Sequence, residues 1–282
     1  MLFQKHQRGL TLLELMIALA LSVVLIGGII TIYTSSKRTY QTRDQLSLMD
    51  ENARVALITL TRSLEHANYK IWSGDYFIRP DAITANRLTN ALCSDGQRNI
   101  KALNLLKPTR DGSSGASDSV GVIFAADNNL YLDCLNMGEN AHAVACRTNA
   151  SGTSQYVYNS FYIDQSSTDN KPNLYCISSR SSSGTPIAQG VENLQFLYGV
   201  DNDNDINHTV DQYLTATEVE TKKLWQKVLT IKVAILMRSN EPALEQAQTK
   251  AYKLLDTTIN TSDRYQRAVY STVVQLRNAV DN

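Results

Sequence analysis

The stretch RGLTLLELMIALALSVVLIGGIITIYTSS, residues Arg8–Ser36, decides the fold. Between Leu10 and Ser36 it carries one charged residue, Glu14. From Leu15 to Ser36 there is none, and as a helix these roughly 22 residues span about 33 Å, enough for the hydrocarbon core of a bilayer. The sequence therefore predicts a membrane-spanning helix at about residues 15–36.

The nine residues at the start, MLFQKHQRG, form a short polar leader that carries Lys5 and Arg8. Positive charge before a membrane span favours a cytoplasmic location for the leader, so the rest of the chain is expected to face outward. No small-residue cleavage site follows the apolar run, so the segment differs from an ordinary secretory signal. Cleavage at Gly9 would leave the apolar helix on the mature chain.

This junction resembles the leader of class III prepilins, in which a basic leader ends in Gly before an apolar residue, Thr, two Leu and Glu. The matching residues are Gly9, Leu10, Thr11, Leu12, Leu13 and Glu14. The resemblance implies that a membrane-embedded prepilin peptidase cuts between Gly9 and Leu10 and methylates the new amino terminus at Leu10. Leu10 stands where family members usually carry Phe or Met, and it keeps the hydrophobic character.

Glu14 needs a physical reason, because an ionised carboxylate costs roughly 2.5 to 3.5 kcal/mol at the centre of a bilayer. The resemblance implies that Glu14 pairs with the positive amino terminus of an adjacent subunit and so sets the axial register of assembly. The alternative is a single-pass anchor in which Glu14 lies at the level of the lipid headgroups.

The helix is expected to cover residues 10–70. Gly27 and Gly28 favour a bend or local melting inside it, since each costs about 0.8 to 1.0 kcal/mol relative to Ala in water. Beyond them, apolar residues recur at intervals of three and four and predict an amphipathic extension lying on a globular head. These residues are Leu46, Met49, Ala53, Leu57, Leu60 and Leu64.

Residues 71–282 are expected to form one sheet-rich periplasmic head, because short apolar runs alternate there with Asn, Asp, Ser and Gly. The expected strands are SVGVIFAA, NLYLDC, YVYNSFYID, NLYCIS, ENLQFLYGV, KVLTIKVAILM and YQRAVYSTVVQLRN. RDGSSGASDS and SSRSSSGT are expected to be surface loops. The predicted fold class is α+β, with a long N-terminal helix packed on a large antiparallel sheet.

The C-terminal segments QGVENLQFLYGVDNDND, KKLWQKVLTIKVAILMRS and YQRAVYSTVVQLRN resemble, in this order, those of minor pilins of the PilW type. The resemblance implies a minor pilin that helps to initiate type IV pilus assembly and is incorporated near the pilus tip, supporting motility or adhesion. It implies as partners other minor pilins, the major pilin, the prepilin peptidase, the inner-membrane assembly platform and a tip adhesin. A type II secretion pseudopilin of the J class is the nearest alternative, and a membrane-tethered periplasmic enzyme or binding module is the second.

All four cysteines lie after the apolar segment, at spacings without a CxxC motif. In an oxidising periplasm this pattern favours disulfides over metal or redox chemistry. The PilW resemblance implies Cys134 with Cys176, which leaves Cys93 with Cys146; Cys134 with Cys146 across a short loop is the alternative.

No motif for catalysis is present: the chain has no Walker loop, HExxH, G-x-S-x-G or paired CxxC. The histidines are scattered, so we expect no enzyme. Lys plus Arg equals Asp plus Glu, at 27 each, and this balance gives no reason to expect a nucleic-acid partner.

No cofactor is expected, apart from a weak calcium candidate in VDNDNDINHTVDQY, where Asp201, Asp203 and Asp205 alternate like the first ligands of a calcium loop. Ile206 and Gln212 stand where a full EF-hand loop has Gly and Glu, so the motif is incomplete. Asp211 or a backbone carbonyl could complete a weak site. The alternative is a solvated turn, since Asn and Asp favour turns.

Overall fold

The computed structural model describes residues 11–69, 77, 108–125, 134, 144–148, 152–178, 183–203 and 209–279. For residues 125, 144–148 and 152–157 it describes the backbone alone. The chain divides into two units, Met1–Gln45 and Leu46–Asn282. The predicted strand NLYLDC lies outside the described residues, except for Cys134.

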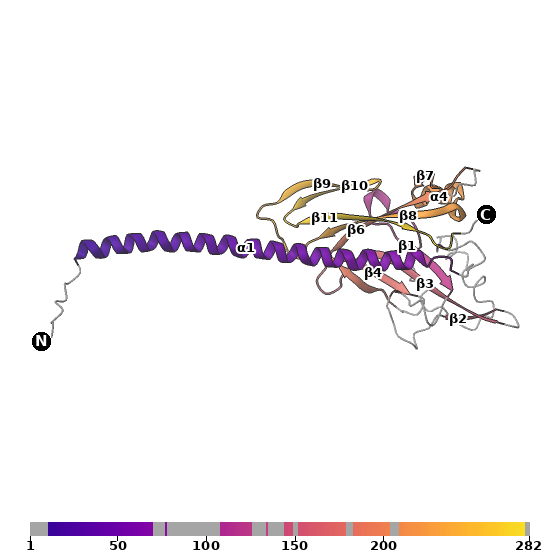
Figure 1. Cartoon of the computed structure of the whole chain (residues 1–282), viewed down its shortest axis with the longest axis horizontal. Coiled ribbons are helices and arrows are strands. Elements are labelled where there is room, and N and C mark those ends of the chain that lie inside the picture. The colour runs from indigo at the N-terminus through magenta and orange to yellow at the C-terminus, as the bar shows by residue number, and fades with distance from the viewer. Residues whose placement is uncertain are drawn as a thin grey trace. The chain divides into compact units, whose positions relative to one another are not determined.

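One long helix, α1 (Leu12–Glu65), passes from the first unit into the second (Figure 1). Gly27 and Gly28 do not interrupt the helix, so the expected local melting is not observed there. Every residue from Thr11 to Gln41 is exposed, as expected of a segment whose partner is lipid or another helix.

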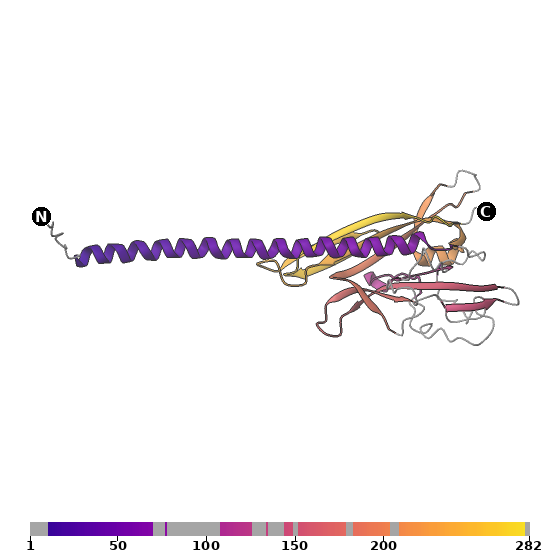
Figure 2. The same cartoon turned by 60° about the horizontal axis from the view of Figure 1, so that its bottom comes forward.

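The head is built from antiparallel strands (Figures 1 and 2). The first sheet has the order β1-β3-β4-β5, with β2 also paired to β3, and the second has the order β11-β8-β6-β7. Their strands are β1 (Val120–Ala125), β2 (Val144–Thr148), β3 (Gly152–Gln165), β4 (Pro172–Ser178), β5 (Thr185–Gln189), β6 (Val191–Val200), β7 (Gln212–Leu214), β8 (Val228–Arg238) and β11 (Arg267–Gln275). Two short 3-10 turns, η1 (Ser113–Gly115) and η2 (Trp225–Lys227), and the helix α4 (Ala216–Lys222) complete these layers.

A single hydrophobic core joins the buried face of α1 to both sheets. Its members from α1 are Met49, Ala53, Ala56, Leu60 and Leu64, which include four residues of the predicted apolar face. The predicted inward faces of β6 and β8 are buried: Leu194, Phe196, Tyr198 and Val200 in β6, and Ile231, Val233, Ile235 and Met237 in β8. Burial does not alternate, however, because residues of the opposite face such as Gln195 and Leu236 are buried as well. Both views show the head part of α1 between β11, β8 and β6 on one side and β3 and β4 on the other.

The chain changes from the first sheet to the second at Gly190, the single residue between β5 and β6. Gly190 has φ +75°, and its N–H donates to Pro172 O while its carbonyl accepts from Arg238 N. A Cβ at this position would lie 2.6 Å from Arg238 O, so the corner requires glycine.

A hairpin that the sequence did not predict, β9 (Gln248–Leu254) with β10 (Thr257–Asp263), covers part of the outer face of β8. Leu254 of the hairpin packs on Ala234 and Leu236. The buried Arg267 of β11 also holds the hairpin in place. Its guanidinium forms ion pairs with Asp263 of β10 at 2.6 Å and with Glu192 of β6 at 2.5 Å. The hydrogen bonds from Arg267 lower the pKa of Asp263.

Candidate functional site

The predicted cleavage junction, Gly9 and Leu10, lies outside the described residues. The helix that follows it is described from Leu12, and in the described part of the chain it is the one helix long and apolar enough to cross a membrane. The predicted span, about 15–36, lies within it.

Glu14 lies in the first turn of α1, where the helix dipole favours a negative charge. Its backbone N–H donates to Thr11 Oγ1 at 3.3 Å, so Thr11 satisfies one of the free N–H groups at the start of the helix. The Glu14 side chain is exposed. A carboxylate in this position is available to a cationic group of another chain.

In the head, α1 has two faces of different character. The buried face belongs to the core, whereas Leu48, Val55 and Ile58 lie on the exposed face. Polar contacts fix the helix at both sheets: Tyr270 of β11 donates to Asp50, and Gln189 N of β5 donates to Asn52 Oδ1 at 3.2 Å. Burial and the contact with Asp50 raise the pKa of Tyr270 to about 12.

The end of α1 is fixed by the C-terminal segment LRN, whose role the sequence reasoning missed. Leu276 is buried, and the Arg277 guanidinium pairs with Glu65 at 3.1 Å. Asn278 Nδ2 donates to Glu65 O at 3.2 Å and to Ala67 O at 3.1 Å, which satisfies carbonyls that a helix end leaves open. The segment therefore caps the helix from the last strand.

A disulfide joins Cys134 to Cys176 of β4, with the Cα atoms 6.4 Å apart. This is the pairing that the PilW resemblance implies. Beside it, the buried Asn159 accepts from Cys134 N at 3.2 Å and donates to Ser63 Oγ of α1 at 3.3 Å. Of the other predicted pair, Cys93 lies outside the described residues and Cys146 lies in β2, where the backbone alone is described.

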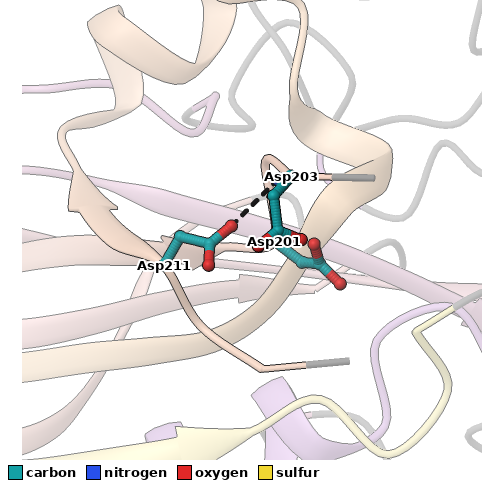
Figure 3. A group of neighbouring side chains, drawn as sticks. All are labelled: Asp201, Asp203 and Asp211. Atoms are coloured by element: carbon teal, nitrogen blue, oxygen red, sulfur yellow. Dashed lines mark hydrogen bonds between the residues drawn. The ribbon is translucent and has the colours of Figure 1, made fainter. Parts of the chain in front are cut away.

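Three aspartates gather where β6 ends and β7 begins (Figure 3). A carboxylate oxygen from each of Asp201, Asp203 and Asp211 lies within 4.8 Å of the others. Asp211 Oδ2 also accepts from Asn202 N at 2.7 Å and from Asp203 N at 3.0 Å, so it closes the turn. Asp205, the third predicted ligand, lies outside the described residues. Asp211, which the sequence suggested as a residue that could complete a weak site, belongs to the cluster.

Hard carboxylate oxygens at this spacing suit Ca²⁺, which takes six to eight oxygen ligands. Three side chains leave several positions for water or backbone carbonyls, and Asp203 and Asp211 are exposed. Any affinity would therefore be low. The two hydrogen bonds to Asp211 give the cluster a structural role as a turn without a cation.

Family models match both the N-terminal unit and the sheet-rich head. Residues 4–30 match the family model of the prokaryotic N-terminal methylation motif. Residues 160–278 match the family model of the type IV pilus-assembly protein W, and together the two matches support a pilin of the PilW type.

Among solved structures, the chain is similar to the type IV-like pilin TTHA1219 from Thermus thermophilus, with 15% sequence identity and a TM-score of 0.41. The alignment covers 85% of this chain and 97% of the other. No curated protein matches the sequence.

Proposed function

We propose that this chain is a minor pilin that helps to start a type IV pilus and is incorporated near the tip. The observation that carries the proposal is the combination of an N-terminal methylation motif with a PilW segment in one chain. The prokaryotic methylation motif and the apolar helix indicate membrane anchoring, and pilins are structural proteins, so the role is assembly without catalysis.

The proposed path begins with a precursor in the inner membrane, with leader 1–9 in the cytoplasm and residues 71–282 in the periplasm. Prepilin peptidase cuts between Gly9 and Leu10 and methylates Leu10. The freed helix then enters the pilus base, where Glu14 pairs with the amino terminus of the subunit already above it. A protein that keeps this glutamate is therefore not the topmost subunit.

The size of the head supports a low copy number. A head of roughly 200 residues would crowd a tightly wound filament, so a place near the end of the pilus is favoured. The proposed partners are other minor pilins, the major pilin, the assembly platform and a tip adhesin.

The test is affinity purification of the full chain from detergent-solubilised membranes, followed by identification of the co-purifying proteins by mass spectrometry. The expected partners are pilins of the type IV pilus. Glu14→Val should reach the membrane at normal levels and lose these partners, whereas Thr34→Val, in the same span, should retain them. Recovery of type II secretion components in place of pilins would favour the J-class pseudopilin and overturn the proposal.

A further inference from the structure

Among the described residues, a regular strand covers one edge of β6 only at its far end. β7 pairs with β6 only at Tyr198–Val200. Before that point the segment 112–118, which leads into β1, takes the place of a strand. Asp118 N donates to Leu194 O at 2.8 Å, and Leu194 N donates to Ser117 Oγ at 3.2 Å.

The carboxylate of Asp118 closes this junction. Its Oδ2 accepts from Phe196 N of β6 at 2.8 Å, and its Oδ1 accepts from Gly112 N at 2.7 Å. One side chain thus holds both the edge of β6 and the start of the covering segment. Asp118 is 4% exposed, although the sequence analysis placed it in a surface loop, and that expectation was wrong for this residue.

The surroundings of Asp118 disfavour a negative charge. Among the described residues no cation pairs with it, and the carboxylates of Asp111 and of Asp256, in the β9–β10 turn, act on it with the same sign. The buried phenol of Tyr198 on β6 interacts electrostatically with Asp118 as well. Burial above all, and then these two aspartates, raise the pKa of Asp118 to about 7 against the opposing effect of the two N–H donors.

We propose that Asp118 holds the two sheets of the head together in a proton-dependent way. With a proton bound, the closed junction carries no uncompensated buried charge, and the segment 112–118 stays on β6. When the proton leaves, the closed junction holds a buried anion near two others, while the open junction lets that anion reach water. Rising pH therefore favours opening.

Linkage gives the sign and the size of the effect. The pKa is near 7 in the closed junction and near 3.8 when Asp118 meets solvent. The closed state binds more protons between these values, so the stability of the junction is greatest below about pH 4 and falls as the pH rises to about 7. From pH 5 to pH 8 the opening equilibrium should rise about a hundredfold.

The test is hydrogen–deuterium exchange of the full chain in detergent micelles at pH 5, 6, 7 and 8, with rates corrected for intrinsic exchange. Peptides that contain Gly112 or Phe196 should lose protection as the pH rises, about a hundredfold over this range. Peptides from the centre of β8, at Ile231–Ile235, serve as the internal reference and should change far less.

Asp118→Asn is neutral at every pH and should abolish the dependence, although it also loses one hydrogen bond and should exchange faster at pH 5. Asp111→Asn is the matched control: it keeps the titrating group and should retain the dependence with a smaller rise, because one of the two charges that raise the pKa of Asp118 is gone. Flat protection in the unmodified chain from pH 5 to pH 8 would overturn the proposal even if Asp118→Asn failed to fold. A slope that persisted in Asp118→Asn would overturn it as well.

Discussion

Truncating a side chain on the buried face of α1 in the head should lower the stability of the fold, whereas truncation on the exposed face should weaken contacts outside the chain. Two residues half a turn apart on this helix test the difference. Leu60 is 0% exposed and belongs to the core that joins both sheets, whereas Ile58 is 44% exposed on the same helix. Leu60→Ala and Ile58→Ala remove apolar groups of similar size. The comparison therefore separates packing within the chain from contacts outside it.

The magnitude follows from burial. Truncating a fully buried Leu to Ala costs about 3 kcal/mol, because the lost transfer free energy adds to that of the cavity left behind. Core packing from the helix and from two sheets limits collapse of that cavity. Ile58→Ala should cost less than about 1 kcal/mol, since its side chain already meets solvent.

The assay is urea unfolding of the full chain in detergent, followed by tryptophan fluorescence, because Trp225 is buried in the head. With a slope near 3 kcal/mol per molar urea, Leu60→Ala should lower the midpoint by about 1 M. Ile58→Ala should leave the midpoint nearly unchanged and reduce co-purification with other pilins. Equal losses of stability in the two variants would refute the assignment of the two faces.

Three further changes test the proposed sites. Gly9→Val should leave the precursor uncut, and N-terminal sequencing of the unmodified mature chain should begin at Leu10; another start would contradict the cleavage site. Cys134→Ser, which frees Cys176, should lower the free energy of unfolding by about 4 kcal/mol, since the bond closes a separation of 42 residues; an unchanged urea midpoint would count against this. Millimolar calcium should raise the melting temperature relative to chelator, and Asp203→Ala should remove the difference; identical curves in the unmodified chain would leave only the turn.

The long helix and the central strands could be predicted because a regular period is visible in the sequence. The apolar positions of α1 recur every three or four residues, and those of β6 and β8 alternate. The helix was expected over 10–70 and is observed at Leu12–Glu65, followed by turns. The difference at its end follows from Asn68, whose φ of 64° ends the helical path.

The hairpin β9–β10 was missed because most of its residues face solvent. Leu254 is its one fully buried side chain, so the strands show no apolar face of their own. Its turn carries Leu255 with φ 48° in place of the usual Asn-Gly signal. A polar hairpin whose stability comes from the outer face of another sheet leaves little pattern in its own sequence.

The acidic cluster shows what a pairing register adds to a motif. Counting along the chain favoured Asp201, Asp203 and Asp205, because calcium loops use alternate positions, and offered Asp211 only as a residue that could complete the site. The structure pairs Val200 with Gln212, which brings Asp201, next after Val200, opposite Asp211, just before Gln212. A residue ten positions away thus joins the cluster because two strands meet, and a search for ligands in a turn between strands must count across the hairpin as well as along it.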